Sequence, residues 1–475
     1  MRNTAWAALA LLLAGCTLGP DFVRPVQPEQ VWHAPLPHGG KLENLANWWE
    51  QFNDPLLNRL IADAERDNPT LDQALARVVE ARSNVDGSTG GYFPGIGLGV
   101  SSTQSKSVFG QQLWRQRLDK VGFDASWELD LLGKNRRSVE ATRATLGASA
   151  ANWHQARISL AAEVADAYVN LRQCEVLLSL TEQVSQSRAV SSRMVGGKAE
   201  AGLASTVDAA RSEAGLADSV STHAARQGDY AKALNKLSAL TGIDQKALQA
   251  RLEAGRGKIP LPNSIDVSRV AAQALSQRPD VAAAEFDLAA ASAEIGVKKA
   301  DLFPSLSLAG SIGINRLHYG GNTFQASTWS FGPSLFIPVF DAGRRKALVD
   351  AAQARYDYAQ AGYRKTVREA VHEIEDALVR LDVANTRLAQ SRKMQQKNLE
   401  IYQAAQSRHD AGMYNRLDLE DAHRNALQSE QTYATDSREA VSAWIALYKA
   451  LGGGWDGTVE VNQISEAGSG EKSGS

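Results

Sequence analysis

The sequence lacks an excess of charge of either sign, and this excludes one class of partner. Its 475 residues include 51 Lys and Arg against 53 Asp and Glu, which gives a formal net charge of −2. A surface that binds nucleic acid needs a clear surplus of basic residues, so we expect no nucleic-acid partner. Because 44% of the residues are hydrophobic and 22% are charged, most of the chain is expected to fold.

Long apolar runs are also missing beyond the N-terminus. No later stretch approaches the roughly 20 consecutive apolar residues that a transmembrane helix needs. In lipid, only helices and closed barrels satisfy their own backbone hydrogen bonds. If the mature protein crosses a membrane, it must therefore cross as strands.

Cysteine is scarce, with only Cys16 and Cys174 in the chain. Residues 1–15 have the short basic start and apolar centre of a signal peptide. Its end, Leu13-Ala14-Gly15-Cys16, resembles the lipobox of bacterial lipoproteins and predicts acylation of Cys16; an ordinary signal peptide with an incidental Cys is the alternative. The next residue is Thr17 and not Asp, and resemblance to the lipoprotein sorting pattern therefore implies the outer membrane. Acylation would leave no second thiol for a disulfide, and Cys174 is expected to be a small buried side chain.

The chain contains one structural unit twice, at an offset of about 210 residues. Tyr92-Phe93-Pro94 corresponds to Leu302-Phe303-Pro304, and Ala201-Gly202-Leu203 corresponds to Ala411-Gly412-Met413. The predicted divisions are an N-terminal lipidated extended segment at 16–50, a first repeat at 51–254, a linker at 255–264, a second repeat at 265–460 and a disordered tail at 461–475.

Each repeat is expected to contain a long helical hairpin, about 135–241 in the first and 344–452 in the second. Apolar residues recur at alternating steps of three and four, as in a coiled-coil seam. An ordinary amphipathic helix in a globular core is the alternative. Gly202 and Gly412 are placed for C-terminal caps with positive φ, and Ser205 and Asn415 for the N-caps that follow.

Each repeat also predicts a pair of strands, about 92–104 with 118–130 and 304–315 with 327–340. Apolar and polar residues alternate along them, as in transmembrane barrel strands. A half-buried soluble sheet is the alternative. Spanning barrels need at least about eight strands, so several chains must share one barrel. The candidate lipid-facing residues are Val121, Phe123, Trp127, Leu129, Trp329, Phe331, Leu335 and Ile337.

Several motifs together resemble the TolC-like outer-membrane efflux factor family, in particular its lipoprotein members of the NodT and OprM type. They include Trp127-Glu128-Leu129-Asp130-Leu131-Leu132-Gly133, Arg278-Pro279-Asp280-Val281 and Pro338-Val339-Phe340-Asp341-Ala342-Gly343-Arg344-Arg345. Each is weak alone, but their order and spacing cover nearly the whole mature chain.

The resemblance implies a mainly α fold with a membrane β-barrel. Long coiled-coil-like helices of a homotrimer would form a twelve-helix periplasmic tunnel continuous with a twelve-stranded barrel, four strands per chain. It implies a passive exit duct in the outer-membrane lipid, fed by a periplasmic adaptor and an inner-membrane pump, usually of the RND type. A periplasmic adaptor lipoprotein is the alternative, but it would carry one hairpin flanked by soluble β domains.

The resemblance also points to a gate at the periplasmic tip of the second hairpin. Leu417 falls where relatives carry a hydrophobic constriction, Asp421 falls where they carry a ring of carboxylates, and Asp418 lies beside them. Helix capping is the alternative role for Asp418, and a solvated helix charge is the alternative for Asp421. Glu420 occupies a position that is often apolar in relatives.

No enzymatic site, metal or cofactor is expected. The eight histidines are scattered, and His372-Glu373-Ile374-Glu375-Asp376 lacks the second His that a zinc protease helix requires.

Overall fold

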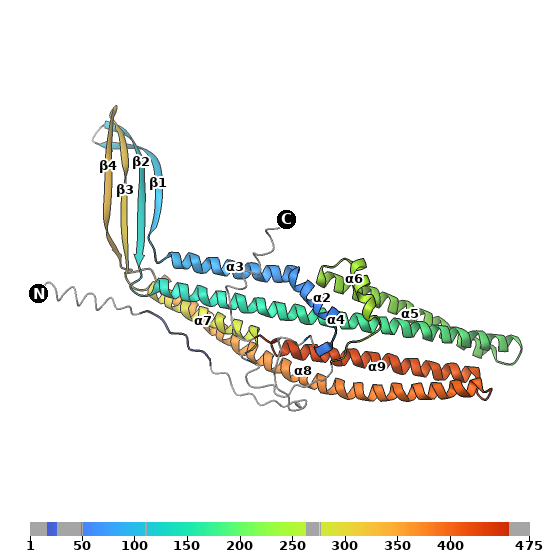
Figure 1. The fold of residues 1–475 in the computed structure, drawn as a ribbon. Helices are drawn as coiled ribbons and strands as arrows, with labels where there is room; N and C mark the ends of the chain where they lie inside the picture. The colour runs from blue at the N-terminus through green and yellow to red at the C-terminus, as the bar shows by residue number, and fades with distance from the viewer. Residues whose placement is uncertain are drawn as a thin grey trace.

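A computed structural model describes residues 17–25, 49, 51–109, 112–262, 275 and 277–455. The predicted signal peptide at 1–15, Cys16 and the predicted tail at 461–475 lie outside these residues. The described chain is elongated, with a four-stranded sheet at one end of a long bundle of helices (Figure 1).

The sheet is antiparallel and follows the chain, in the order β1-β2-β3-β4. Its strands are β1 (Gly95–Phe109), β2 (Gln112–Leu129), β3 (Ser305–Tyr319) and β4 (Asn322–Phe336). Strands β1 and β4 are the two edges, and each has a single neighbour in the described chain. The register between β2 and β3 joins the two predicted strand pairs into one sheet.

One face of the sheet is apolar and the other is small and polar. Leu98, Phe123, Ile312 and Trp329 lie side by side across the four strands, and the next row toward the helices contains Ile96 and Phe331. We call this the apolar face. Its large side chains are exposed in the single chain, 79% for Trp329 and 74% for Phe331. The opposite, polar face carries glycines, serines and charged residues. Exposed apolar area of this extent marks a surface that contacts lipid or protein.

The predicted strand ends differ from the observed ones at both ends of the sheet. Near the helices, β1 begins at Gly95 and not at about 92. Strand β4 ends at Phe336, so Ile337 was wrongly placed in a strand. Phe336 pairs with Ser305, which is the first residue of β3. The pairing ends there because the next residue of β3 would be Pro304, and because Pro338 also has no N–H to donate. At the far ends, the hairpins extend further than predicted, to Phe109 and Tyr319. Pairing continues there although the two faces exchange character, since Leu118, Leu317 and Phe324 form a row on the otherwise polar face.

The helices are α2 (Pro55–Arg66), α3 (Pro69–Gly90), α4 (Lys134–Glu200), α5 (Thr206–Thr241), α6 (Gln245–Leu252), the 3₁₀ turn η2 (Glu253–Gly255), α7 (Pro279–Ala300), α8 (Arg344–Asp410) and α9 (Arg416–Ala450). Helices α4 and α8 contain 67 residues each, and a helix of that length measures about 100 Å. In the described part of the chain, no helix has both the length and the apolar character to cross a membrane.

The helices form two layers of four helices each, one after the other along the bundle, and the long helices α4 and α8 run through both. Near the sheet, α3 packs on α4, α4 on α7 and α7 on α8 (Figure 1). Further away, α5 packs on α4, α4 on α9 and α9 on α8. The main core lies where the layers meet, and Leu171, Leu237, Ile374 and Trp444 are at most 1% exposed there. Cys174 is buried in this core as expected, and burial raises the pKa of its thiol.

The hairpin turns have the predicted caps. Gly202 and Gly412 adopt φ values of +71° and +72°. Ser205 Oγ accepts a hydrogen bond from the Asp208 amide, and Asn415 Oδ1 accepts one from the Leu417 amide. The two hairpins therefore reverse direction in the same way, which places both tips at the end of the bundle farthest from the sheet (Figure 1).

A buried ion pair fixes the middle of the bundle. Arg172 and Glu175 on α4 have side chains that are 0% and 3% exposed, and their charged atoms lie 2.9 Å apart. Arg172 also donates to the Leu252 carbonyl, and Glu175 accepts from the Gly257 amide. The pair therefore ties α4 to the segment that leaves the first hairpin.

Replacing Glu175 with Ala should lower the free energy of unfolding by about 3 kcal/mol, because the buried guanidinium would lose its counter-charge. Thermal unfolding followed by circular dichroism in detergent measures this loss. Glu253→Ala is the matched control, because Glu253 pairs with Arg256 on the surface and should change stability by less than about 1 kcal/mol. Equal stability of the two variants would contradict the structural role of the buried pair.

Candidate functional site: the sheet and the helical tips

The apolar face of the sheet has the height of a membrane's apolar band. Its apolar rows run from Leu129 to Val121 on β2, with Leu306 to Ile314 opposite on β3. The eight residue-to-residue steps from Val121 to Leu129 measure about 27 Å. A tilt of about 40° reduces this to about 21 Å along the membrane normal, near the roughly 25 Å of an outer-membrane barrel. The predicted lipid-facing residues all lie on this face, except that Ile337 follows β4.

The sheet of one chain cannot close on itself, because β1 and β4 each leave a row of backbone groups unpaired within the described chain. Such edges do not occur in lipid. The helical layer beside the tips is open in the same way, since α5 and α8 lie at its two edges. Both parts of the molecule therefore present edges that other chains could complete.

Near the second hairpin tip, α9 is buried on two sides. Leu419 and Ala422 pack with Ala405 of α8, and Glu420 and Arg424 face α4. Leu417, Asp418 and Asp421 lie on the remaining side of the helix. Asp418 and Asp421 are exposed and Leu417 is half-buried. The three predicted gate residues thus share one side of α9 that is not covered within the chain.

Glu420 is a buried carboxylate that links the two hairpins. Glu420 is only 4% exposed. Ser187 Oγ on α4 donates to Glu420 at 2.7 Å, and the Arg416 guanidinium lies 2.6 Å from the other carboxylate oxygen. Breaking a buried, hydrogen-bonded charge is costly, so Glu420 holds the start of α9 against α4.

Arg424 makes a second link at the same place. Its guanidinium donates to Ser187 and to Ser191 on α4, both at 3.0 Å, and pairs with Asp421. Burial lowers the pKa of Arg424, and the charge of Asp421 offsets part of this effect. The side chain of Asp421 is 65% exposed, whereas that of Arg424 is only 12% exposed. Asp421 is therefore a partly neutralised carboxylate at the surface of the tip.

An aromatic contact supports this arrangement from α8. The Tyr402 ring stacks on the His423 ring with their centroids 4.6 Å apart. Burial lowers the pKa of His423, although the nearby Glu420 carboxylate opposes this effect. We call the set of Ser187, Ser191, Glu420 and Arg424 the tip latch, because it joins α4 of the first hairpin to α9 of the second.

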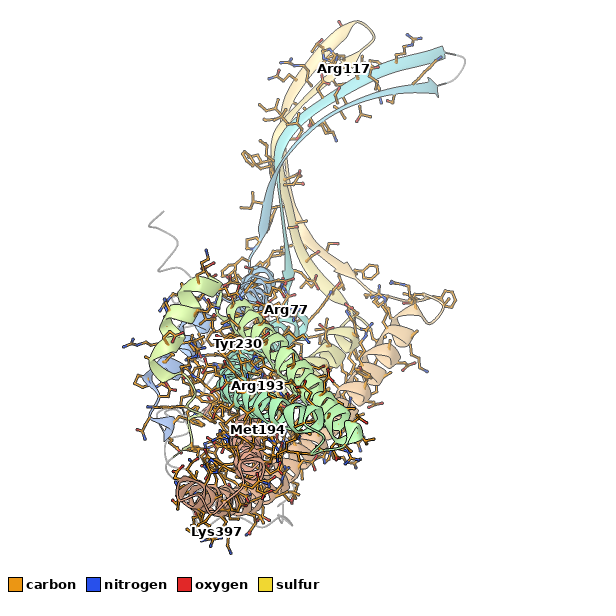
Figure 2. All side chains as sticks on the ribbon, turned by 90° about the vertical axis from the view of Figure 1, so that its right-hand side faces the viewer. Arg77, Arg117, Arg193, Met194, Tyr230 and Lys397 are labelled. Atoms are coloured by element: carbon orange, nitrogen blue, oxygen red, sulfur yellow. The ribbon has the colours of Figure 1, made fainter. Side chains whose placement is uncertain are left out.

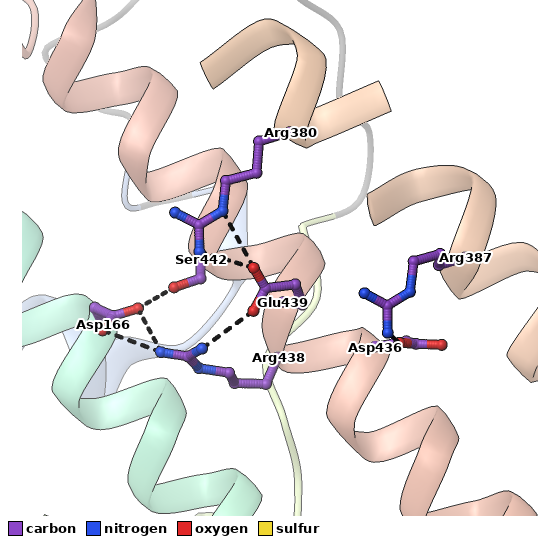
Figure 3. Close-up of polar contacts among 7 residues, drawn as sticks. All are labelled: Asp166, Arg380, Arg387, Asp436, Arg438, Glu439 and Ser442. Atoms are coloured by element: carbon purple, nitrogen blue, oxygen red, sulfur yellow. Dashed lines mark hydrogen bonds and ion pairs between the residues drawn. The ribbon is translucent and has the colours of Figure 1, made fainter. Parts of the chain in front are cut away.

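A larger ionic network joins the same helices nearer the middle of the bundle (Figure 3). Arg438 on α9 pairs with Asp166 on α4 at 3.3 Å, and Arg380 on α8 pairs with Glu439 on α9 at 2.7 Å. Burial alone would raise the pKa of Glu439, but the hydrogen bond and charge of Arg380 hold it below its ordinary value. This network and the tip latch both connect the two hairpins within the chain.

The tip latch was not predicted from the sequence. The spacings from Arg416 to Glu420 and from Asp421 to Arg424 match helical ion pairs, which was an available signal. The partner of Glu420 could not be inferred, because Ser187 is 233 residues away. Among the described residues, no group of three or more His, Cys, Asp or Glu side chains could hold a metal ion.

Comparison with known proteins decides the family. A model of the family described as outer membrane efflux protein matches residues 60–243 and 270–453. The chain belongs to the outer membrane efflux protein family. Each match covers one hairpin together with its strand pair.

Individual relatives agree along nearly the full length. The chain is 28% identical to nodulation protein T of Rhizobium leguminosarum bv. viciae, covering 95% of this chain and 93% of that protein. It is 30% identical to the toluene efflux pump outer membrane protein TtgF of Pseudomonas putida, covering 94% and 96%. Among solved structures, the outer-membrane channel OprN is 29% identical and has a TM-score of 0.82, covering 93% of this chain and 100% of OprN.

Family membership identifies the protein as an outer-membrane efflux channel of a tripartite system in a Gram-negative bacterium. The family's activity is passive conduction and not catalysis. The adaptor alternative is not supported, because this chain has two hairpins and a sheet with an exposed apolar face.

Proposed function

We propose that three copies of this chain form one outer-membrane exit duct. Strand β1 of each copy would pair with β4 of the next, giving a closed barrel of twelve strands with the apolar face toward lipid. The tunnel below would close in the same sense, with α5 and α3 of one copy against α8 of the next. The observation that carries this proposal is the four-stranded sheet with a lipid-like outer face and two unpaired edges.

The two repeats, at about 51–254 and 265–460, are part of the same proposal. Support comes from the equal lengths of α4 and α8 and from the two separate family matches. Each repeat would contribute one strand pair and one hairpin, so that three chains give six nearly equivalent units around the pore.

The duct would receive its cargo from a periplasmic adaptor and an RND-type inner-membrane pump. Support comes from the family and from the name of the relative TtgF, which is described as part of a toluene efflux pump. A strain that lacks this protein should accumulate the exported compounds, and the intact gene should restore export. Recovery of the protein in the inner-membrane fraction alone would contradict the proposal and favour an adaptor.

Cys16 would carry the lipid that anchors the N-terminus. The described segment 17–25 lies at the junction of sheet and helices, where the Leu18 amide donates to the Leu132 carbonyl at 3.1 Å. Arg137 at the start of α4 donates to the Leu18 carbonyl and pairs with Asp21 at 2.6 Å. Acyl chains on Cys16, the residue before this segment, would therefore start near the inner edge of the apolar band.

The mass of the N-terminal peptide tests this anchor. Peptides from the mature protein should begin at Cys16 and carry the mass of attached acyl chains, and Cys16→Ser should abolish both features. A mature N-terminus without acyl mass would contradict lipidation and leave the proposed barrel unaffected.

Leu417, Asp418 and Asp421 would form the narrowest part of the tunnel in the closed state. Three copies of each would surround the axis, where an apolar side chain blocks water and a carboxylate ring favours cations. Leu417→Ala should raise the single-channel conductance in planar bilayers, and Asp421→Ala should lower the preference for cations. If neither conductance nor selectivity changes in either variant, these residues do not form the gate.

A further inference from the structure

The apolar face changes character toward the end of the sheet farthest from the helices. Beyond Val121, the same side of β2 carries Asp119, Arg117 and Arg115. Their cross-strand neighbours on this face are also polar or charged, and they comprise Ser102, Gln104 and Lys106 on β1, Arg316 and His318 on β3, and Thr323 and Gln325 on β4. Figure 2 shows Arg117 near the distal end of the sheet. Residues directly opposite each other in an antiparallel sheet project from the same face. These polar side chains therefore lie on the same side of the sheet as the apolar face.

Most charges in these rows are positive. Among the described residues, these rows contain one carboxylate, that of Asp119, and four cations. The four cations are Lys106, Arg115, Arg117 and Arg316, and we call them the outer belt. Asp119 accepts from Ser102 at 2.6 Å and from Arg117 at 2.8 Å, and its other oxygen lies 3.4 Å from His318. One carboxylate therefore orients part of the belt without neutralising it.

The belt members are accessible to a ligand. Lys106, Arg115, Arg117 and Arg316 are exposed in the described chain. A hollow of about 640 Å³ between the ends of the two strand pairs is lined in part by Lys106, Arg115 and Arg117. The remaining charged residues of β2, which are Lys120, Asp124 and Glu128, project from the opposite, polar face of the sheet. The belt is thus confined to the side that would face the membrane.

The inner rows of the belt, with Arg316 and Arg117, lie nearest the headgroup region of a membrane. Successive rows on one face are two residues apart, about 6.8 Å along the strand or about 5 Å along the membrane normal at a tilt of 40°. The belt therefore lies about 5 to 16 Å beyond the last apolar row. Headgroups occupy roughly the first 5 to 8 Å outside the hydrocarbon core, and long Lys and Arg side chains reach several ångströms along the surface.

We propose that the outer belt binds the phosphate groups of the anionic glycolipid, of the lipid A type, in the outer leaflet of the outer membrane. Arginine guanidinium groups bind phosphate with two parallel charge-assisted hydrogen bonds. Anionic phosphate would supply the counter-charge that the belt lacks within the chain. The inference rests on the proposed barrel, because only closure around a pore turns this face toward lipid.

Lipid titration of the purified full-length channel in detergent tests the proposal, with bound lipid counted by native mass spectrometry. The probe is lipid A with both phosphates, compared with the same lipid after its phosphates are removed. The Arg117→Gln, Arg316→Gln double variant should bind the phosphorylated lipid about 25-fold more weakly, at about fivefold per removed cation. The dephosphorylated lipid should bind weakly to the wild type and to the variant.

Lys120→Gln is the matched control, because Lys120 lies at the same height on the polar face and its removal should leave lipid affinity unchanged. Equal affinity of the double variant and the control, or equal binding of both lipids, would overturn the proposal. If the double variant does not assemble, the Lys106→Gln, Arg115→Gln variant, which leaves the Asp119 contacts intact, takes its place with the same expectation. Wild-type protein that forms no trimer would instead overturn the barrel itself.

Discussion

Gly313→Val should prevent assembly of the barrel. A Cβ atom at Gly313 would lie 2.5 Å from the Val121 carbonyl oxygen and 2.8 Å from the Gly122 Cα. Both contacts are to backbone, so no side-chain rotation can relieve them, and β2 and β3 would have to separate. Gly99, Gly122 and Gly313 form one row across three strands on the polar face, and the sheet as a whole is strongly curved (Figure 2). Glycine is needed there because neighbouring backbones approach closely.

Electrophoresis of unheated outer-membrane extracts measures this effect, because assembled barrels migrate as oligomers that heating dissociates. Gly313→Val should remove the oligomer band and the protein should be degraded or remain unassembled. Gly332→Val is the matched control, since Gly332 lies on the same face of β4 and a Cβ there would meet nothing within 4 Å. Normal assembly of Gly313→Val would contradict the close pairing of β2 with β3.

Arg424→Ala should open the periplasmic tip. The substitution removes the bonds to Ser187 and Ser191 and also frees Asp421 from its counter-charge. Loss of the cross-hairpin contact should raise single-channel conductance severalfold. Three unpaired Asp421 carboxylates should at the same time increase the preference for cations.

Two variants separate these effects. Arg424→Lys keeps a positive charge beside Asp421. In the wild type, Nη1 of Arg424 donates to both serines while Nη2 pairs with Asp421. The single ammonium nitrogen of Lys cannot occupy both positions, so conductance should rise with little change in selectivity. Arg211→Ala is the control, because Arg211 forms an exposed pair with Asp208 at the other hairpin tip. Equal conductance of Arg424→Ala, Arg211→Ala and the wild type would show that the tip latch does not hold the gate.

The sequence was informative wherever a pattern repeats along one element. Steps of three and four predicted α4 and α8, and alternation predicted the faces that carry Phe123 and Trp329. Local chemistry also predicted the caps at Gly202 and Gly412. These features depend on neighbours within a few residues, which a single sequence displays directly.

The sequence failed where the deciding partner is distant or the pattern fades. The outer halves of the strands were missed because the alternation of apolar and polar residues changes face there, with Leu118, Leu317 and Phe324 on the otherwise polar face. Cross-strand pairing nevertheless continues to Phe109 and Tyr319. Ile337 fits the alternation but lies beyond the last paired residue. Glu420 has an ambiguous direction on a helical wheel until Ser187 is known to lie beside it.

Native mass spectrometry of the mature, detergent-solubilised protein tests the central claim most directly, because it counts the chains that share one barrel. We expect a single species of three identical chains, since one chain has four strands and two unpaired edges in the described sheet. A stable single chain, or a closed particle with any other number of copies, would contradict the shared barrel.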